Sequence, residues 1–465
     1  MYHLTINDTI CALSTAPGIG AIAVIRVSGT ETIEIMETIF HSDRKDFSLR
    51  NVQSHSVHYG TIGDIGNILD EVLLSVFRAP HSYTGEDVVE ISCHGSTYIQ
   101  QKLLELLISK GTRLAKPGEF TLRAFMNGKF DLSQAEAVAD LIAAQSLTSH
   151  DLALKQVRGG FSKKIKDLRD KLLQFTALIE LELDFGEEDV EFANRHDLLN
   201  LLLELKQEIS LLINSFEIGN VIKKGIPVTI IGKPNVGKST LLNAILNEEK
   251  AIVSEIPGTT RDAIEDTIVI GGYSFRFIDT AGLRSSSETI ESMGIERTWE
   301  KIHQASVILY VFDVTVQSFE DVLEAVSELQ DQTELSSKRL ILVGNKTDML
   351  EELPHGFLSF VEHETIFVSA KRKENIHLLA DSLVKSIEDS NISDTTIVSN
   401  TRHLEALKHA FAAIESTHQG LESGLSPDLL TIDIRTALHH LGEITGEITT
   451  EEILGAVFSR FCVGK

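Results

Sequence analysis

The sequence predicts a multidomain protein of the α/β plus all-α class, with a mixed α+β amino-terminal domain, a discontinuous helical domain and an inserted P-loop α/β domain. Three observations lead to this prediction. The chain has 465 residues, more than one ordinary domain contains. Its hydrophobic pattern turns helical from residue 131 and becomes an alternation of strands and helices after residue 225. Helical periodicity returns after residue 400.

Residues 1–127 are predicted to form the amino-terminal domain. Strand-like runs cover 21–29, 70–77 and 86–95, and turn clusters such as APGIG (16–20) lie between such runs. This alternation favours a mixed α+β domain.

The first helical segment is predicted over 128–218. Ser133 and Glu136 form a capping-box pattern that marks a helix start. The helical pattern breaks near 184–192 in an acidic run, which we interpret as a solvated loop.

The second helical segment is predicted over 388–465, after a polar linker. Thr449 and Glu452 form another capping-box pattern. Neither helical segment looks self-sufficient, so we predict that the two pack together as one domain. The predicted helices of the second segment cover 401–421, 427–442 and 450–461.

Residues 219–387 are predicted to form the inserted domain. Continuous apolar strands alternate there with helices, which is typical of a doubly wound, mostly parallel sheet. The predicted strands are PVTIIG (227–232), SFRFID (274–279), SVILYVFD (306–313), RLILVG (339–344) and TIFVSA (365–370).

Composition narrows the class of protein. With 42% hydrophobic and 24% charged residues, the chain can bury sizeable cores, as soluble globular proteins do. The net charge of −26 argues against a protein coated in nucleic acid, although it leaves room for a local basic patch. The amino terminus has no signal-peptide pattern, and no apolar stretch approaches the length of a membrane span. We therefore expect no membrane partner.

The cysteines fit a reducing compartment. Cys11, Cys93 and Cys462 are odd in number and share no metal-like spacing, so we expect a cytoplasmic protein. Cys11 and Cys93 lie in strand-like runs and are expected in the core.

A phosphate-binding loop is predicted at residues 232–240. The segment GKPNVGKST fits the pattern GxxxxGKS and stands between a strand and a helical run, the context that the motif requires. Its backbone N–H groups can surround phosphates, Lys238 adds a charge between the β- and γ-phosphates, and Ser239 offers an oxygen to Mg²⁺. The sequence therefore predicts a nucleoside triphosphate site.

The base is predicted to be guanine. NKTD (345–348) ends a strand, and Asp348 can accept two hydrogen bonds that guanine donates and adenine cannot. Asn345 suits the opposite edge of the base, and SAK (369–371) can brace the ring.

Two further segments complete the pattern of a GTP hydrolase. DTAG (279–282) ends a strand, where Asp279 can hold Mg²⁺ through water and Gly282 can sense the γ-phosphate. PGTTRD (257–262) stands where a first switch loop belongs, with Thr260 as the second protein oxygen on Mg²⁺.

The residues that would activate water differ from the Ras pattern. Leu283 follows DTAG, near where a Gln orients the attacking water in Ras-like proteins. Glu291 is a candidate for this role, and a solvated helix-start residue is the alternative interpretation. Asn235, in the middle of the P-loop, can bind a monovalent cation whose charge replaces that of an arginine finger.

These motifs, together with segments outside them, resemble the MnmE family, also called TrmE, of bacterial and organellar tRNA-modification GTPases. The resemblance covers the whole chain. Ribosome-assembly GTPases share the nucleotide motifs, whereas the amino-terminal blocks and the tail are specific to this family. These specific blocks are GIGAIAVIRVSG (18–29), YTGEDVVEISCHG (83–95), KPGEFTLRAFMNGKFDLSQAEAVADLI (116–142) and FCVGK (461–465).

The resemblance implies a folate-binding, dimerising amino-terminal domain, a split helical domain and a Ras-like G domain. It implies a homodimer that joins a MnmG-like, FAD-dependent flavoprotein in a heterotetramer. The complex would add an aminomethyl or carboxymethylaminomethyl group to carbon 5 of the wobble uridine of certain tRNAs. The one-carbon unit would come from 5-formyl- or 5,10-methylene-tetrahydrofolate, and hydrolysis would be activated by potassium-dependent pairing of G domains.

The resemblance also implies site residues. Folate contacts fall on Arg26, Glu90, Lys129 and Lys465, with Cys462 at or near that site. Potassium ligands fall on Asn235, Ser254, Thr259 and the carbonyl of Ile256, Mg²⁺ ligands on Ser239 and Thr260, and catalytic roles on Glu291 and Lys238. The nucleotide contacts are Asn235, Val236, Gly237, Lys238, Ser239, Thr240, Ser254, Thr259, Thr260, Asp279, Thr280, Ala281, Gly282, Asn345, Lys346, Asp348, Ser369 and Ala370.

Two further interpretations of the whole chain stay open at this point. A ribosome-assembly switch would use the same nucleotide motifs without modification chemistry, and a structural dimeric scaffold would not need a complete GTP site. For tRNA, the best local candidate is a basic stretch, with a solvated helix laced by pairs to Asp167 and Asp170 as the equally good alternative. The basic residues are Arg158, Lys163, Lys164, Lys166, Arg169 and Lys171.

Overall fold

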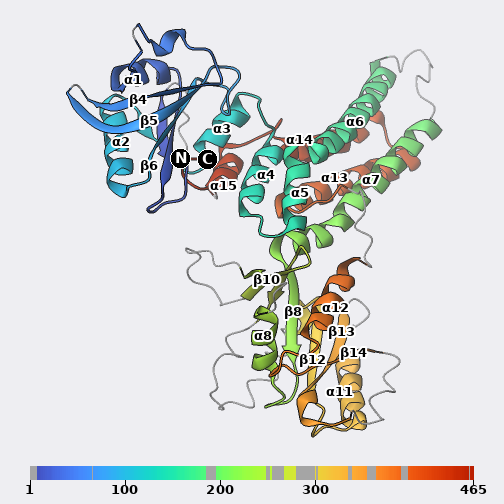
Figure 1. The fold of residues 1–465 in the computed structure, drawn as a ribbon. Coiled ribbons are helices and arrows are strands. Elements are labelled where there is room, and N and C mark those ends of the chain that lie inside the picture. The colour runs from blue at the N-terminus through green and yellow to red at the C-terminus, as the bar shows by residue number, and fades with distance from the viewer. Residues whose placement is uncertain are drawn as a thin grey trace. The chain divides into compact units, whose positions relative to one another are not determined.

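The computed structural model places most of the chain in two compact units (Figure 1). Unit 1 comprises Met1–Ile142, Leu154–Glu208 and Glu405–Lys465, and unit 2 comprises Ala143–Ala153 and Ile209–Leu404. The boundaries predicted at 127, 218 and 387 stay predictions. The structure describes residues 8–44, 46–64, 66–184, 195–247, 252–253, 266–278, 299, 302–332, 338–352, 363–388, 396–459 and 461–465.

Unit 1 contains a seven-stranded sheet in the order β3-β4-β5-β6-β2-β1-β7. Its pairs are antiparallel except for the parallel pair of β1 with β7. The runs predicted at 21–29, 70–77 and 86–95 are confirmed as β2, β5 and β6. The strands are β1 (Ile10–Leu13), β2 (Ile22–Ser28), β3 (Phe40–His41), β4 (Ser56–Asp64), β5 (Asn67–Phe77), β6 (Val88–His94) and β7 (Arg113–Leu114).

One face of this sheet carries the core of the amino-terminal part. Helices α1 (Thr32–Ile39) and α2 (Thr97–Ser109) cover it with apolar side chains such as Met36 and Leu103, both fully buried. Cys11 and Cys93 lie in this core, as predicted. On β5 burial alternates residue by residue, as expected for a strand with one packed face.

The helices of unit 1 come from both sides of the segment that forms most of unit 2. Helix α6 (Gly160–Asp184) packs against α14 (Pro427–Thr445), although the two are far apart in sequence. The buried residues of α6 recur at helical spacing, as in Ile165, Leu168 and Leu172. The other helices that lie wholly or mostly in unit 1 are α3 (Glu119–Met126), α4 (Leu132–Ala143), α13 (Thr401–Glu422) and α15 (Glu451–Phe458). Helices α5 (Leu147–Val157) and α7 (Arg195–Lys224) are each divided between the two units.

The capping boxes predicted at these helix starts were wrong in position. At α4 the reciprocal box is formed by Asp131 and Gln134: the Gln134 N–H donates to the Asp131 carboxylate, and the Asp131 N–H donates to the Gln134 side chain. Ser133 lies inside the helix and donates to Asp131 instead. At α15 the cap is Thr450, whose hydroxyl accepts from the Ile453 N–H. At each helix start, two neighbouring polar residues could act as the cap. The residue at which the helical backbone begins determines which of them does so.

Unit 2 contains a second seven-stranded sheet, in the order β14-β13-β12-β8-β11-β10-β9. Strands β14, β13, β12, β8 and β11 are parallel, and β10 and β9 extend the sheet in antiparallel pairs. The prediction of a mostly parallel sheet is therefore confirmed. The strands are β8 (Ile226–Ile231), β9 (Ile252–Val253), β10 (Asp266–Ile270), β11 (Tyr273–Phe277), β12 (Val307–Asp313), β13 (Arg339–Asn345) and β14 (Glu364–Phe367).

Helices cover both faces of this sheet, as a doubly wound fold requires. Helices α8 (Lys238–Leu246) and α12 (Ile376–Glu388) contribute to one apolar cluster, and α11 (Phe319–Gln332) contributes to another. In the parts of the chain that the structure describes, no helix is both long and apolar enough to cross a membrane.

Candidate functional site

The P-loop curls between the end of β8 and the start of α8. Gly232 has φ +145°, and a Cβ there would lie 2.1 Å from the Val311 carbonyl oxygen. Gly237 has φ +96°, and a Cβ there would lie 2.4 Å from the Asn345 side-chain nitrogen. Asn235 also adopts a left-handed conformation, at φ +63°. Glycine is needed at both close approaches, which is why the motif has glycines there.

Lys238 folds back over this loop. Its ammonium donates to the carbonyl oxygens of Gly232 and Lys233, each at 2.8 Å. Burial lowers the pKa of Lys238. These carbonyl contacts hold the ammonium at the loop, where it can meet phosphate oxygens.

Asn345 joins three pieces of the site. Its side-chain nitrogen donates to the Val236 carbonyl at 2.8 Å, and its side-chain oxygen accepts from the Ala370 N–H at 3.0 Å. The residue is 2% exposed. The P-loop and the SAK segment are therefore fastened to the end of β13 by one side chain.

Asp348 is held in place by a neighbour from the SAK segment. The Ser369 hydroxyl donates to its carboxylate at 2.7 Å. Lys346, at φ +69°, forms an ion pair of 2.6 Å with Asp313 at the end of β12. Burial alone would raise the pKa of Asp313, but contacts with Lys346 and Thr315 outweigh it, so that this pKa lies below its ordinary value.

A cavity of about 350 Å³ lies where these pieces meet. It brings the P-loop, NKTD and SAK residues together, as the motifs predicted. Met349 also lines it, a residue that the sequence did not single out. The lining residues are Gly237, Thr240, Asn345, Lys346, Asp348, Met349, Ala370 and Lys371. The predicted residues Ser254, Ile256, Thr259, Thr260, Asp279, Thr280, Ala281, Gly282 and Glu291 lie outside the described residues.

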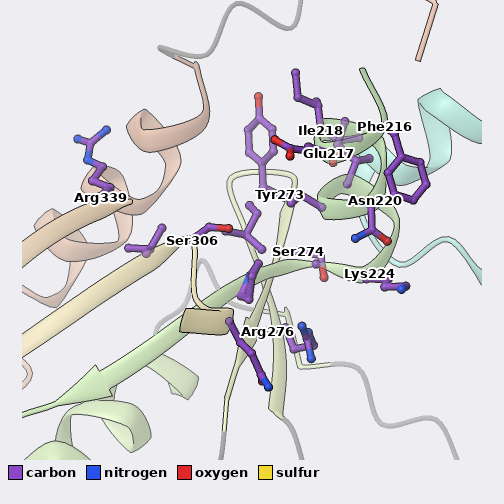
Figure 2. A pocket seen from close by; sticks show the side chains of 18 residues that line it. Phe216, Glu217, Ile218, Asn220, Lys224, Tyr273, Ser274, Arg276, Ser306 and Arg339 are labelled. Carbon is purple, nitrogen blue, oxygen red and sulfur yellow. The ribbon is translucent and has the colours of Figure 1, made fainter. Parts of the chain in front are cut away.

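A second cavity, of about 610 Å³, lies at the other end of the strands of the same sheet (Figure 2). It is lined where β8, β12 and β13 begin and where α7 ends. Figure 2 shows Tyr273 and Arg276 leaving β11 in opposite directions. Because the nucleotide motifs follow the carboxyl ends of the strands, this cavity is separate from the nucleotide site.

In unit 1, three of the four predicted folate residues lie around one point of the sheet. Arg26 and Glu90 are cross-strand partners on β2 and β6, joined by an ion pair of 2.8 Å. The Gly464 carbonyl accepts from the Arg26 guanidinium at 3.4 Å, which brings Lys465 to the same place. Lys129 makes another contact: its ammonium donates to the Pro80 carbonyl at 2.6 Å.

Two aromatic rings complete the surroundings of Arg26, and the sequence did not single them out. The guanidinium carbon lies 5.2 Å from the ring centre of Tyr83 and 5.5 Å from that of Phe120. Tyr83 belongs to the block YTGEDVVEISCHG that the resemblance identified. The sequence therefore pointed to this segment, but it did not predict the contact of Tyr83 with Arg26. The Tyr83 hydroxyl is hydrogen-bonded to Thr121 of α3 at 2.9 Å.

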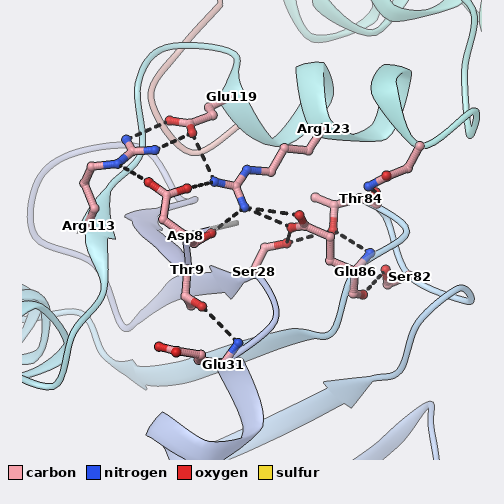
Figure 3. A network of polar contacts seen from close by, with 11 residues as sticks. Asp8, Thr9, Ser28, Glu31, Ser82, Thr84, Glu86, Arg113, Glu119 and Arg123 are labelled. Carbon is pink, nitrogen blue, oxygen red and sulfur yellow. Dashed lines mark hydrogen bonds and ion pairs between the residues drawn. The ribbon is translucent and has the colours of Figure 1, made fainter. Parts of the chain in front are cut away.

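A network of charged side chains anchors α3, which carries Phe120 (Figure 3). Arg123 is 3% exposed and contacts Asp8, Glu86 and Glu119. Arg113 pairs with Asp8 and Glu119 as well. Ser28 of β2 donates to Glu86 at 2.7 Å, which links the network to the strand of Arg26.

Three of the six cations in the basic stretch proposed for tRNA form ion pairs within unit 1. Lys171 pairs with Glu204 and Glu208, Lys164 pairs with Glu208, and Arg169 pairs with Glu447. Glu204 and Glu208 belong to α7, and Glu447 follows the end of α14. Ion pairs are therefore present, as the alternative interpretation expected, and these three glutamates are among the partners; the predicted pairs to Asp167 and Asp170 stay a prediction. The remaining cations of the stretch are Arg158, Lys163 and Lys166.

The fold and the cavity define a P-loop protein of the G-domain class, in which the P-loop and the segments that follow parallel strands line one cavity. Family models match at residues 9–129, described as the GTP-binding protein TrmE N-terminus, and at 132–462, described as the MnmE helical domain. The chain belongs to the MnmE family of tRNA modification GTPases.

Full-length relatives agree with this assignment. The chain is 50% identical over 467 residues to the tRNA modification GTPase MnmE of Flavobacterium psychrophilum, covering 100% of both chains. It is 52% identical to that of Parabacteroides distasonis, covering 98% of this chain and 100% of the relative. Among solved structures, the G domain of the T. maritima FeoB iron transporter aligns at 25% identity and TM-score 0.26, over 35% of this chain and 98% of that one.

Proposed function

We propose that this chain binds and hydrolyses GTP in the cavity at the carboxyl edge of the unit 2 sheet, as one step of wobble-uridine modification in tRNA. The observation that carries the proposal is the convergence of Gly237, Asn345 and Asp348 on one cavity. Hydrolysis breaks the bond to the γ-phosphate. Lys238 would neutralise the charge that develops there, and Ser239, at the start of α8, would hold Mg²⁺ together with Thr260.

Guanine selection is tested at Asp348. Its carboxylate would accept hydrogen bonds from N1–H and the exocyclic amine of guanine, each worth about 1.5–3 kcal/mol. Asp348→Asn should lower GTP affinity by roughly 10²–10⁴-fold and favour xanthosine triphosphate, whose C2 carbonyl can accept from the new amide. Unchanged preference for GTP, measured by competition binding, would refute this role.

Water activation is proposed for Glu291. Glu291→Ala should lower turnover by roughly 10²–10⁴-fold and leave GTP affinity near that of the unaltered chain, whereas Lys238→Ala should weaken binding. Normal hydrolysis by Glu291→Ala would return that residue to the solvated-surface interpretation.

A potassium ion is proposed beside the phosphates, held by Asn235, Ser254, Thr259 and the carbonyl of Ile256. The donors are all neutral oxygens, which suits a monovalent cation, and Asn235 is exposed in the P-loop. Bound potassium would add positive charge that stabilises the transition state. Hydrolysis should be faster in potassium than in sodium, and Asn235→Ala should remove the difference. Equal rates in both salts would defeat the proposal.

The modification chemistry is proposed for the site around Arg26, Glu90 and Lys465, with Lys129 as a further contact and Cys462 nearby. A carboxylate suits the pterin edge of folate, and cations suit its glutamate tail. A bound 5-formyl- or 5,10-methylene-tetrahydrofolate would supply the one-carbon unit. A MnmG-like flavoprotein would complete the cytoplasmic complex and supply redox chemistry.

A homodimer is proposed through exposed apolar side chains on strands β4 and β5 of the unit 1 sheet. Val57, Tyr59 and Leu73 are each about half exposed or more, at 61%, 56% and 48%, and Tyr59 and Leu73 are cross-strand partners. Adjacent exposed apolar side chains of this kind mark protein interfaces.

The whole proposal is tested by nucleoside analysis of tRNA from cells that lack the gene. We expect wobble uridines without the carbon 5 substituent, restored when the gene is returned. Fully modified uridines in its absence would favour the ribosome-assembly alternative.

A further inference from the structure

Asp313 ends β12, the strand that lies between β8, which leads into the P-loop, and β13, which leads into NKTD. The register pairs Asp313 with Asn345, and the Val314 N–H donates to the Asn345 carbonyl at 3.2 Å. Lys346 follows Asn345 and therefore leaves the sheet beside Asp313. Asp313 belongs to none of the nucleotide motifs and is not one of the residues that line the nucleotide cavity.

The Asp313 carboxylate is buried and has partners on both oxygens. One oxygen accepts from the Thr315 N–H at 2.9 Å and from the Thr315 hydroxyl at 2.6 Å, and the other lies 2.6 Å from the Lys346 ammonium. The Asp313 side chain is 8% exposed. A charge buried to this extent needs a partner charge, so the pair with Lys346 differs from an incidental surface contact.

Lys346 stands at a sharp change of chain direction. Its φ of +69° is uncommon for a residue that carries a side chain. The chain passes there from β13 into the short turn Thr347–Met349, which contains Asp348, and the Met349 N–H donates to the Lys346 carbonyl at 3.1 Å. The ion pair with Asp313 restrains Lys346 and, through it, the start of this turn.

The same ion pair determines what Lys346 offers to the nucleotide cavity, which it lines together with Asp348 and Met349. Because Asp313 neutralises the ammonium, Lys346 contributes its carbon stem to the cavity wall and not a free charge. Such a stem packs well against an apolar or planar surface. Lys238 differs, because its ammonium lies at the P-loop, where phosphates are expected.

We propose that Asp313 is a positioning residue for recognition of the base. It holds the Lys346 stem as one wall of the nucleotide cavity and restrains the turn that carries Asp348, without touching the nucleotide. The proposal rests on the proposed GTP site and deepens it. Asp313 should therefore affect how tightly the guanine part of the nucleotide binds and leave the hydrolysis step unchanged.

The first test titrates the full-length chain with GMP and with GDP. Asp313→Asn keeps the shape of the side chain and an acceptor for Thr315, but it loses the charge that pairs with Lys346. Both nucleotides should bind about tenfold more weakly or worse, by the same factor, because one charged hydrogen bond is lost. Turnover at saturating GTP should stay within about twofold. A loss confined to GDP, or a lower turnover with unchanged affinity, would overturn the proposal.

A double-mutant cycle tests whether Asp313 acts through Lys346. Lys346→Met keeps an unbranched stem and removes the ammonium, and it should also weaken GDP binding. Adding Asp313→Asn to Lys346→Met should weaken binding by less than a further twofold, since the two residues act as one unit. Losses that multiply in the double variant would show that Asp313 acts by another route, which refutes the proposal.

The matched control is Glu364→Gln. Glu364 forms an ion pair of 2.7 Å with Arg339, and both residues stand at the other end of the same sheet, where β14 and β13 begin. This variant should leave GDP affinity and turnover unchanged. A loss of affinity as large as that of Asp313→Asn would mean that any broken ion pair in this sheet has the effect, and the positioning role would fall.

The last measurement needs no nucleotide. In the ligand-free chain, Asp313→Asn should speed amide hydrogen exchange at 347–349 by about tenfold or more, with exchange of the β12 amides unchanged. Exchange at 347–349 that stays at the rate of the unaltered chain would overturn the restraint on the turn. If the unaltered chain binds neither GMP nor GDP, the proposed GTP site fails, and the exchange rates still decide whether Asp313 positions the turn.

Discussion

Asn345 shows how much one side chain contributes to the nucleotide cavity. It is buried, and its two hydrogen bonds hold the P-loop at Val236 and the SAK segment at Ala370. Asn345→Ala should lower GTP affinity by roughly 50-fold, since two hydrogen bonds of about 1–1.5 kcal/mol each are lost.

The control for Asn345→Ala is Asn247→Ala. Asn247 also donates from its side chain to a backbone carbonyl, that of Asn243, but on the exposed end of α8. Its substitution should leave GTP affinity within about twofold. Equal losses in the two variants, measured by isothermal titration, would contradict the fastening role of Asn345.

At the residue scale, sequence predicts motifs well and contacts poorly. Gly237, Asn345 and Asp348 follow from short patterns whose spacing is fixed by one loop and two strand ends. The rings of Tyr83 and Phe120 beside Arg26 do not, because that contact joins three segments through tertiary packing. The predicted helix caps were wrong by one or two residues, because Asp131 and Thr450 each have a neighbour of similar chemistry.

At the element scale, α3 depends on its buried charges. Burial alone would raise the pKa of Glu119, but the Arg113 hydrogen bond, the Lys116 N–H and the charges of Arg113 and Arg123 outweigh it, so that this pKa lies below its ordinary value. A carboxyl with a lowered folded-state pKa stabilises the fold above its unfolded pKa of about 4.3. That contribution is lost as the pH falls through the lower, folded-state value.

Glu119→Gln should therefore destabilise unit 1 by about 2 kcal/mol at pH 6, because Arg113 and Arg123 lose one of their charged hydrogen-bond partners while Asp8 and Glu86 remain. The variant should also lose less stability than the unaltered chain between about pH 5 and pH 3. The measurement is the urea midpoint of β2 peptides, read by pulsed hydrogen exchange. Glu105→Gln, which removes an exposed pair with Lys102, should leave the midpoint nearly unchanged.

Strands with a strong hydrophobic pattern were predicted from the sequence, whereas strands with a weak or interrupted pattern were missed. Strands β8, β12 and β13 are continuous apolar runs and were found nearly to the residue. Strand β10 was missed, although Gly271 and Gly272, both with positive φ, form its turn to β11 and were a readable hairpin signal. Strand β4 was missed because its histidine, tyrosine and glycines dilute the alternation.

At the scale of the whole molecule, the exposed strip on β4 and β5 predicts self-association. Leu73→Lys would place a charge in the proposed dimer interface, and burying an unpaired charge is costly. We expect a shift from dimer to monomer by sedimentation equilibrium. Ile108→Lys is the control, because Ile108 is similarly exposed, at 42%, on α2. Dimers that persist in Leu73→Lys would move the interface elsewhere.

The order of segments along the chain was predictable from changes in hydrophobic period, and the packing of α6 against α14 agrees with two helical segments that need each other. The ion pairs that these segments form were not predictable from the sequence. Lys171 and Arg169 lie in a stretch that reads as a basic surface, and only the fold reveals Glu204, Glu208 and Glu447 opposite them.

The three cysteines differ in exposure, and this difference allows a fluorescent dye to be attached at one selected position. Cys11 and Cys93 are buried, and burial raises the pKa of both thiols, that of Cys93 to about 11, so that little thiolate forms there near neutral pH. Cys462 is exposed and lies two residues from Gly464. A maleimide dye should attach once, at Cys462, as intact mass spectrometry would show. Its emission would then report movement of the tail in real time, without removal of any other cysteine.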